Sequence, residues 1–541
     1  MLNYVWLALL LLGITAALTS DIVDQSSNRY RNGDPLNVEL IFNESFSESE
    51  SKTISAEIIL APEIYNNHYN QAFQDTIRQS VKLTIEPVNS LHALYFKVSE
   101  KSPLLWQNMA KVAGDEDDLT GTVEIKQLLS SYRADAEIIL EEVSFIKMKE
   151  VTNSAIDYAG TAVKIAIGLI GIMALWLGIM KIAEEAGLIT IIAKTVRPIT
   201  RFLFPDVPHD HPAIGSIIMN ISANMLGLGN AATPFGLKAM EELDKLNEKK
   251  GTATNAMCTF LAINTAGLTL VPATAIAIRA AAGSSDPAII IGTSFFGATC
   301  ATIVGILSAK ILEKFPLRGK GIPGQFKSNI KGLLILISVL VAIGILLVTG
   351  LLSELFAMLG GADTFKLLIQ ILSTVAIPMI IFLFVAYGAL KKVKIYEVFV
   401  EGAKEGFNIA VRIIPFLVAM LVAIGIFRAG GAMEFLVLIL DPVTSLIGMP
   451  AEALPMALMR PLSGSGSLGI MAEIISVHGP DSFIGILVST IMGSTETTFY
   501  VIAVYFGAVN IRNSRHALAA GLLADVAGIL GAIFIVHLLF G

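Results

Sequence analysis

Long apolar runs separated by short polar breaks fill most of the chain after about residue 154. Several runs reach the roughly 20 residues that a helix needs to cross a bilayer. The pattern predicts a polytopic α-helical membrane protein. We expect spans near 161–182, 254–281, 287–311, 331–351, 365–389, 408–428, 483–509 and 516–540, and two hairpin-like segments near 212–233 and 451–475.

The first 20 residues form another apolar run. It lacks a positively charged start, and Ala-Leu-Thr-Ser before Asp21 is only a weak cleavage site. An uncleaved anchor helix is therefore preferred to a cleaved signal segment.

The hydrophobic period changes between residue 21 and about residue 153. Apolar and polar residues alternate there, and β-branched residues are frequent, which is typical of half-buried strands. This stretch is expected to form a small β-rich domain. The strand-like segments are VELIF, ISAEIILA, SVKLTIEPV, LYFKV, TGTVEIKQLL and AEIILEEVSFIKMK.

Composition and charge sharpen this division. The chain is 54% hydrophobic and 15% charged, which is too apolar for a soluble domain. Residues 21–150 hold 22 of its 45 acidic residues and 12 of its 38 basic ones, so the net charge of −7 arises in this stretch. Lys and Arg gather in loops on one side of the spans, which predicts that this side is cytoplasmic and the β-rich domain extracytoplasmic.

Two interrupted stretches dominate the membrane part. NISANMLGLGNAATP at residues 220–234 and RPLSGSGSLG at residues 460–469 combine Asn, Ser, Gly and Pro in apolar surroundings. Such residues are tolerated in a membrane mainly where they are buried in protein or line a wet cavity. We therefore expect re-entrant hairpins at a binding site.

The two halves of the membrane part align with each other. Residues 178–234 and 424–470 share a span, a break and spaced prolines, and residues 264–269 match residues 493–498 inside later spans. The loop charges place the two copies in opposite orientations. Two inverted repeats with re-entrant hairpins and broken helices are thus expected, as in transporters that bind solute near the midplane.

The expected organisation has five parts. They are an N-terminal anchor or signal segment (1–20), the extracytoplasmic β-rich domain (21–153), a first repeat (154–315), linking transmembrane helices (316–394) and a second repeat (395–541).

Amide and hydroxyl side chains in the interrupted stretches are the candidates for binding a neutral polar solute, because they offer both donors and acceptors. The structural alternative is that they cap hairpin ends and brace neighbouring helices. The expected solute-binding residues are Asn220, Asn224, Asn230, Thr233, Asn264, Thr265, Arg460, Ser463, Ser465, Ser467, Ser494 and Thr495.

Two carboxylates lie within expected spans. Glu496 and Asp525 could carry a proton or hold a coupled cation, since ionisable groups in a membrane are rare and usually paired or functional. Equally, Arg460 could simply neutralise one of them.

Motifs for other chemistry are weak or absent. Gly464, Gly466 and Gly469 form a GxGxxG without the strand that a dinucleotide site requires. The sequence His209-Asp210-His211 lacks a further ligand cluster, so a solvated turn is favoured over a metal site. We expect no catalytic residues, no cofactor, no metal and no nucleic-acid partner.

Several long motifs resemble a known family. GIMALWLGIMKIAEEAGL, LFPDVPHDHPA, NISANMLGLGNAATPFGLKAMEELDKLN and FLAINT are similar to spore maturation protein A. EGAKEGFNIAVRIIPFLVAMLVAIGIFRAGGA, ALMRPLSGSGSLGI, HGPDSF, GSTETTFYVIAVYFG and RHALAAGLLAD are similar to spore maturation protein B. The chain resembles a fusion of the two over about residues 155–315 and 365–541.

The resemblance implies membership of the nucleoside-recognition Gate family, with inverted repeats that contain hairpins. The family includes parts of concentrative nucleoside transporters and of a ferrous-iron transporter, so the resemblance does not define one solute. The long β-rich insert departs from the short connection expected in spore maturation protein A. It favours a role in the periplasm of a cell with two membranes.

The leading functional hypothesis is a multi-pass transporter of a bacterial plasma (inner) membrane. It would move a small polar, nucleoside-like solute by alternating access, with Na⁺ or H⁺ as coupling ion, and the sequence allows a homo-oligomer. The alternative is a non-transporting scaffold or sensor for envelope, cell-wall or spore maturation. An enzyme is not expected.

Overall fold

The computed structural model describes residues 2–47, 51–86, 90–113, 117–227, 232–314, 338 and 361–541. The chain divides into two compact units. One unit contains residues 7–157 and 425–435, and the other contains residues 1–6, 158–424 and 436–541. Each unit is described by itself.

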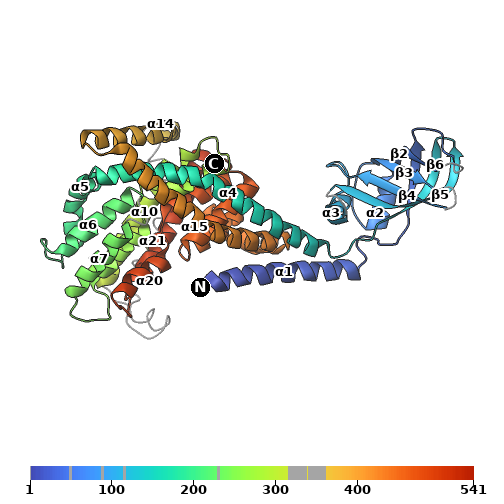
Figure 1. Cartoon of the computed structure of the whole chain (residues 1–541). Coiled ribbons are helices and arrows are strands. Elements are labelled where there is room, and N and C mark those ends of the chain that lie inside the picture. The colour runs from blue at the N-terminus through green and yellow to red at the C-terminus, as the bar shows by residue number, and fades with distance from the viewer. Residues whose placement is uncertain are drawn as a thin grey trace. The chain divides into compact units, whose positions relative to one another are not determined.

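The first unit holds a closed barrel of six antiparallel strands (Figure 1). Each strand pairs with the next along the chain, and the first pairs with the last, which leaves no free sheet edge. The strands are β1 (Leu36–Phe42), β2 (Lys52–Leu60), β3 (Ile77–Ile85), β4 (Leu91–Lys97), β5 (Asp118–Ser130) and β6 (Arg133–Leu140).

Alternating side chains fill the barrel. Every second residue of β3, from Ile77 to Ile85, is buried, as the period-2 pattern predicts for a strand with one face inside. Helices α2 (Pro62–Tyr69) and α3 (Leu104–Ala113) complete the core, where the indole of Trp106 is fully buried and donates to the Tyr69 hydroxyl at 3.3 Å.

The last expected strand is partly wrong. In the segment AEIILEEVSFIKMK the strand ends at Leu140, and a helix begins at Ile146. The carboxylate of Asp21 accepts hydrogen bonds of 2.9 Å from the backbone N–H groups of Lys147 and Met148. A distant carboxylate therefore caps this helix, because the first amides of a helix have no partner within it.

The second unit is helical. Its first half contains a helical hairpin, formed by α6 and α7, and one broken helix, formed by α8 and α9. The elements are α4 (Ile146–Glu185), α5 (Leu188–Leu203), α6 (Pro212–Met225), α7 (Ala232–Lys245), α8 (Asn255–Ala266), α9 (Ala273–Ala281), η2 (Pro287–Ile289) and α10 (Ile290–Lys314).

The second half follows α14 (Gly361–Leu390) and repeats this order of long helix, Pro-containing helix, hairpin, broken helix and closing helix. The elements are α15 (Ile395–Ala429), α16 (Ala432–Thr444), η3 (Ser445–Ile447), η4 (Ala451–Ala453), α17 (Leu454–Met459), α18 (Gly464–His478), α19 (Phe483–Ser494), α20 (Thr498–Ala508) and α21 (Ala517–Phe540).

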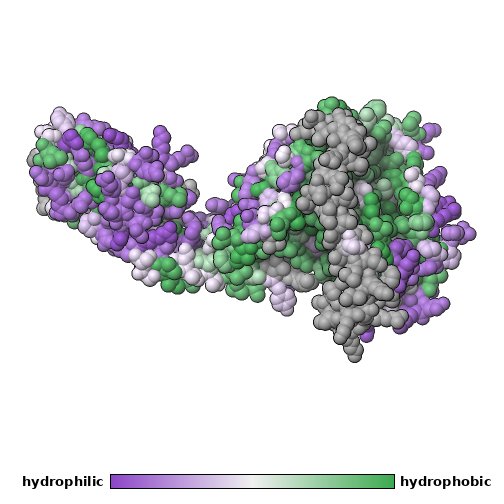
Figure 2. All heavy atoms as spheres, turned by 180° about the vertical axis from the view of Figure 1, so that it is seen from behind, coloured by the Kyte–Doolittle hydropathy of each residue, from purple (hydrophilic) through white to green (hydrophobic). Residues whose placement is uncertain are grey.

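Six helical segments within the described residues are long and apolar enough to cross a membrane. They are Trp6–Ser26, Ile146–Glu185, Pro287–Lys314, Ile395–Ala429, Phe483–Ala508 and Ala517–Phe540. Broad apolar areas cover the helical unit, whereas the surface of the barrel unit is mostly polar (Figure 2). The chain is thus a multi-pass helical membrane protein with a β-barrel insert. The expected span at 331–351 lies outside the described residues, apart from Ser338.

The N-terminal helix α1 (Leu2–Ser26) continues past residue 20, where the first segment was expected to end. It crosses the end of α15 very closely. A Cβ added at Gly13 would lie 2.7 Å from the Ile426 carbonyl oxygen and 2.8 Å from the Phe427 Cα. Only glycine allows this approach, because the opposing atoms belong to the backbone and cannot rotate away.

We expect Gly13→Leu to lower stability by about 1–3 kcal/mol, because its side chain must displace backbone rather than a flexible neighbour. Thermal unfolding of the purified protein in detergent measures the effect. Gly160→Leu is the matched control, since a Cβ at Gly160 meets nothing within 4 Å. Equal melting temperatures for the two variants would contradict the close crossing.

Candidate functional site

The first helix break separates α8 from α9. Gly267 ends α8 in the left-handed conformation, with φ at +61°, and donates its N–H to the Ile263 carbonyl at 3.3 Å. Pro272 precedes α9 and has no N–H to donate. The expected span at 254–281 is therefore interrupted at 267–272 by residues that stop one helix and start another.

The second break separates α19 from α20. Ser494 is the last residue of α19, and Thr495 has extended backbone angles of −144° and 171°. Helix α20 starts again at Thr498. The expected span at 483–509 is thus interrupted within the Ser-Thr-Glu-Thr-Thr segment.

The two breaks contact each other directly. The backbone N–H of Glu496 donates to the carbonyl oxygen of Thr265 at 2.9 Å. Gly267 also lies against Glu496, since an added Cβ would be 3.1 Å from the Glu496 Cβ. A backbone donor freed by one break is therefore satisfied by the helix end at the other, as an apolar environment requires.

Arg460 supports the second break from the end of α17. Its side chain is only 3% exposed. One terminal nitrogen donates to the Thr495 carbonyl oxygen, and the other lies 3.4 Å from Thr497 Oγ1. The guanidinium also lies 3.6 Å from the carboxylate of Glu496, which is 49% exposed. One buried cation thus serves a freed carbonyl and a carboxylate together.

Asn224 supports the first break from the end of α6. Its amide nitrogen donates to Asn264 Oδ1 at 3.0 Å, and the Asn264 amide nitrogen donates to the Phe260 carbonyl at 2.9 Å. The backbone N–H of Leu270 donates to the Met225 carbonyl at 2.8 Å. The hairpin end is therefore tied to the break by side chains and backbone.

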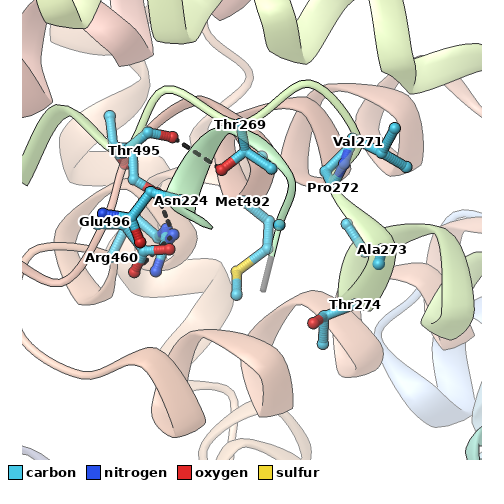
Figure 3. A pocket seen from close by; sticks show the side chains of 14 residues that line it. Asn224, Thr269, Val271, Pro272, Ala273, Thr274, Arg460, Met492, Thr495 and Glu496 are labelled. Atoms are coloured by element: carbon cyan, nitrogen blue, oxygen red, sulfur yellow. Dashed lines mark hydrogen bonds and ion pairs between the residues drawn. The ribbon is translucent and has the colours of Figure 1, made fainter. Parts of the chain in front are cut away.

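A cavity of about 120 Å³ lies between these groups (Figure 3). Asn224, Arg460, Thr495 and Glu496 gather on one side of it, and Val271 to Thr274 lie on the other. Thr495 Oγ1 and Arg460 Nε are buried and make no hydrogen bond within the described residues. The lining residues are Asn224, Gly227, Gly267, Thr269, Val271, Pro272, Ala273, Thr274, Ala275, Arg460, Met492, Gly493, Thr495 and Glu496.

Several expected site residues lie outside the lining. Asn220 is fully buried, and its amide nitrogen donates to the Ala232 carbonyl at 2.8 Å and lies 3.3 Å from the Tyr505 hydroxyl. These bonds brace the hairpin, which matches the structural alternative. Thr233 is half-buried at the start of α7, and Asn230 lies outside the described residues.

The serines of the second hairpin satisfy the first turn of α18. Ser463 is its N-cap and accepts from the Gly466 N–H at 3.0 Å, while the Ser467 hydroxyl donates to the Ser463 carbonyl at 2.7 Å. The hydroxyl oxygens of Ser463 and Ser465 are 3.4 Å apart. Ser494 likewise donates to the carbonyl of Thr490 at 2.6 Å. Local bonds within helices or at their ends thus occupy the hydroxyls of Ser463, Ser467 and Ser494.

Asp525 is 1% exposed in the middle of α21. It accepts a hydrogen bond of 2.6 Å from the Thr498 hydroxyl at the start of α20, and its Oδ1 is buried without a partner among the described residues. The two expected carboxylates therefore differ, since Glu496 faces the cavity and Asp525 does not line it.

Sequence reasoning missed one wall of the cavity. Thr269 and Val271 lie within the first break, Thr274 follows it in α9, and Met492 precedes the second break in α19. Gly267 and Pro272, which bracket the first break, were a usable signal. Met492 had none, because a methionine in an apolar helix is typical of any core. No cluster of three or more metal-ligating side chains occurs in the described part of the chain, including His209 to His211.

The geometry defines a class: a multi-pass helical membrane protein with two broken helices that meet at a polar cavity. The Gate family, described as nucleoside recognition, matches residues 166–282 and 410–512. These two regions contain the hairpins and the breaks. No solved structure matches the chain.

Curated relatives match separate parts of the chain. Spore maturation protein B of Bacillus subtilis (strain 168) is 55% identical over 174 residues, which cover 98% of that protein and 32% of this chain. Spore maturation protein A of the same strain is 44% identical over 168 residues, 84% of that protein and 31% of this chain. Inner membrane protein YjiG of Escherichia coli (strain K12) is 31% identical over 81 residues, 53% of that protein and 15% of this chain. The chain belongs to the spore maturation protein family and joins an A-like and a B-like part in one polypeptide.

We expect Gly267→Ala to destabilise the protein more than Gly251→Ala. Both glycines have positive φ, so each alanine incurs about 1–2 kcal/mol of backbone strain. Only the Cβ at position 267 meets a neighbour, Glu496, and displacing it adds about 1–3 kcal/mol. Thermal unfolding of both variants tests this, and similar losses would mean that the breaks do not press on each other.

Proposed function

We propose that this protein is a secondary transporter that carries a small polar solute through the cavity at the two helix breaks. The observation that carries the proposal is the contact between the breaks, with Glu496 N–H bonded to the Thr265 carbonyl beside a polar cavity. Broken helices present unpaired donors and acceptors to solutes, and they are a recurrent feature of transporter binding sites.

The contacts between helices support two repeats related by a pseudo-two-fold axis. The relation exchanges α7 with α18, α8 with α19, α9 with α20 and α10 with α21. Under it, the contact of α8 with α21 becomes that of α19 with α10, and the contact of α7 with α20 becomes that of α18 with α9. All four contacts are present. Helix α10 packs against α21, its own counterpart (Figure 1). Alternating access commonly relies on such repeats.

The loop between α7 and α8 contacts the loop between α20 and α21, and both loops carry basic residues. Ala253, between α7 and α8, donates its N–H to the Asn513 carbonyl at 3.0 Å. Arg515, between α20 and α21, donates to the Ala253 carbonyl at 3.1 Å. We call this contact the α7/α20 clamp.

The symmetry-related loops form a second clamp. Asp481, between α18 and α19, lies 2.9 Å from the guanidinium of Arg279 and accepts from the N–H and hydroxyl of Ser285, both at 2.8 Å. Arg279 is fully buried. We call this contact the α9/α18 clamp. Each clamp joins one half to the other, so both are suited to act as gates, and both are closed here.

The cavity limits what the closed state can hold. About 120 Å³ accommodates a few water molecules, at roughly 30 Å³ each, or a small cation. Sites for larger organic ligands start at roughly 300 Å³. A nucleoside-like solute, which the family description suggests, therefore requires the breaks to separate, as opening of one clamp would allow.

Glu496 is the better candidate for coupling to Na⁺ or H⁺. Its carboxylate is 49% exposed at the cavity, whereas Asp525 is 1% exposed and holds a hydrogen bond from Thr498. A cation that enters the cavity can reach Glu496 without breaking that bond. Asp525 would act as a structural acceptor, or as a proton site only after α20 moves.

The loop charges support a plasma (inner) membrane orientation with the α7/α20 clamp on the cytoplasmic side. Lys245, Lys249, Lys250, Arg512 and Arg515 lie in or beside its loops. Basic residues in short loops favour the cytoplasmic face. The β-barrel would then lie outside the cytoplasm, where the rival function, an envelope scaffold or sensor, would also place it.

We expect a solute that binds the cavity to raise the melting temperature of the purified protein. A ligand at 100 times its Kd stabilises the folded state by about 2.7 kcal/mol. Asn224→Ala should remove the effect, since its amide lines the cavity. Asn220→Ala should lower the starting stability by about 1–3 kcal/mol, because it leaves the buried Ala232 carbonyl without its donor, yet keep the ligand effect.

Nucleosides, nucleobases, amino sugars and cations form the test panel, and Glu496→Gln should lose only the cation effect. Uptake of the stabilising compound into proteoliposomes then separates transport from binding. If no compound stabilises the wild type, the scaffold hypothesis replaces the transporter.

We expect Arg279→Gln to open the α9/α18 clamp alone. The variant removes the ion pair with Asp481 and the hydrogen bonds that the guanidinium donates to the Pro480 and Asp286 carbonyls. Each hydrogen bond from a charged group contributes about 1.5–3 kcal/mol, so reagent access to the cavity should rise by at least about tenfold. The reporter is Thr274→Cys in a background with Cys258 and Cys300 replaced by Ala, labelled with a membrane-impermeant thiol reagent. Arg515→Gln should raise labelling by reagent that is added on the opposite face of the membrane. If either variant raised labelling equally from both faces, the two clamps would not be separate gates.

The pH dependence of the α9/α18 clamp follows from Asp481. Burial opposes its ionisation, but hydrogen bonds from Ser284 and Ser285 and the charge of Arg279 outweigh burial and lower the pKa of Asp481 below 3.8. A lowered pKa stabilises the clamp above the ordinary value, and this stability is lost only as the pH falls through the lowered one. The labelling rate of the Thr274→Cys reporter, divided by its rate in the Arg279→Gln variant at the same pH, should therefore stay constant from pH 5 to 8, since the rise in thiolate with pH affects both rates alike.

A further inference from the structure

A second cavity, of about 440 Å³, lies between α5 and the start of α6, away from the helix breaks. It is more than three times larger than the cavity at the breaks and falls within the range of small-ligand sites. Its wall consists of Thr190, Ala193, Lys194, Arg197, His209, Asp210, His211, Pro212, Ile214, Gly215, Ile218 and Met219. The proposed transport mechanism does not use it.

Basic side chains dominate the polar part of this wall. Lys194 and Arg197 lie three residues apart on α5, and His209 and His211 face them from the loop before α6. Asp210 is the one acidic residue among those that line it. Within the described residues neither Lys194 nor Arg197 forms an ion pair, whereas Lys245 at the end of α7 pairs with Glu242.

The chemistry of the wall fits an anion of tetrahedral oxygens. A guanidinium presents a planar fork of donors, and an ammonium adds a compact charge, a combination that suits phosphate. The N-terminus of α6, which begins at Pro212, adds a partial positive charge at the same wall. Both cations are exposed, so a phosphate group can reach them from solution or from the membrane surface.

The outer surface of α5 indicates where such a group would come from. Ile191, Ile199 and Phe202 are 44%, 58% and 83% exposed on a helix that also carries Lys194 and Arg197. Exposed apolar and basic residues on one amphipathic helix are typical of segments at the level of lipid headgroups. Basic pockets at that level bind anionic headgroups.

We propose that this cavity is a binding site for a phosphate-bearing group, held by Lys194 and Arg197 with His209 and His211 completing the wall. The headgroup phosphate of an anionic phospholipid and the phosphate of a soluble compound share this chemistry. The site is independent of the cavity at the helix breaks, so it stands even where the transporter proposal fails.

The test measures binding to the full-length protein in detergent by native mass spectrometry and by thermal stability. The probes are short-chain phosphatidylglycerol, the corresponding diacylglycerol, which lacks the phosphate, and inorganic phosphate. The variants are Lys194→Gln with Arg197→Gln, Lys194→Arg with Arg197→Lys, and the control Lys249→Gln, which removes a charge outside this cavity.

We expect phosphatidylglycerol to bind the wild type, and the double Gln variant to weaken it at least tenfold. The variant that keeps both charges and the Lys249→Gln control should retain the wild-type affinity. Stabilisation by inorganic phosphate that depends on Lys194 and Arg197 would support a soluble phosphate compound as the ligand. Equal binding of diacylglycerol, unchanged affinity in the double Gln variant, or no binding of either phosphate probe would overturn the proposal.

Discussion

A broken helix in a membrane frees backbone N–H and C=O groups that neither lipid nor the helix itself can satisfy, and the helical unit depends on how this constraint is met. The two breaks meet it largely together. Glu496 donates its N–H to the end of α8, and Arg460 donates to the Thr495 carbonyl. Because the bond between Glu496 and Thr265 crosses from one half to the other, neither break is fully satisfied without its counterpart. The requirement for backbone partners thus holds the halves together where a solute would bind.

The buried arginines likewise bind backbone and side-chain groups at the same time. Arg460 and Arg279 are the two nearly or fully buried arginines of the helical unit described here, and each serves backbone carbonyls as well as a carboxylate. A carbonyl oxygen keeps its partial charge when a helix or loop moves, whereas a carboxylate can exchange its partner for a cation or a proton. The bond from Arg460 to the Thr495 carbonyl therefore does not depend on the contact with Glu496.

The barrel solves the backbone problem by another route. Its six strands close on themselves, so every strand has two neighbours and alternating side chains fill the interior. This solution tolerates a polar outer face, which is why residues 21–150 can hold nearly half of the acidic residues of the chain. The same polypeptide thus contains a unit suited to water and a unit suited to lipid. Their patterns differ in period, 2 in one and about 3.6 in the other.

The sequence by itself determined the features that depend on local chemistry. Apolar runs predicted most of the spans, alternation predicted most of the strands, and Asn, Ser, Gly and Pro in apolar surroundings marked the two hairpins. The break between Gly267 and Pro272 lies inside the expected span 254–281, although both residues are typical of helix ends. The distinction between Asn220 and Asn224 was decided only by the tertiary structure. Both lie on one face of α6, but α7 and Tyr505 cover the first, whereas the second reaches Asn264 and the cavity. Likewise, only the packing of α8 against α21 and of α19 against α10 brings Thr265 to Glu496 across more than 200 residues, since sequence patterns specify faces but not which faces meet.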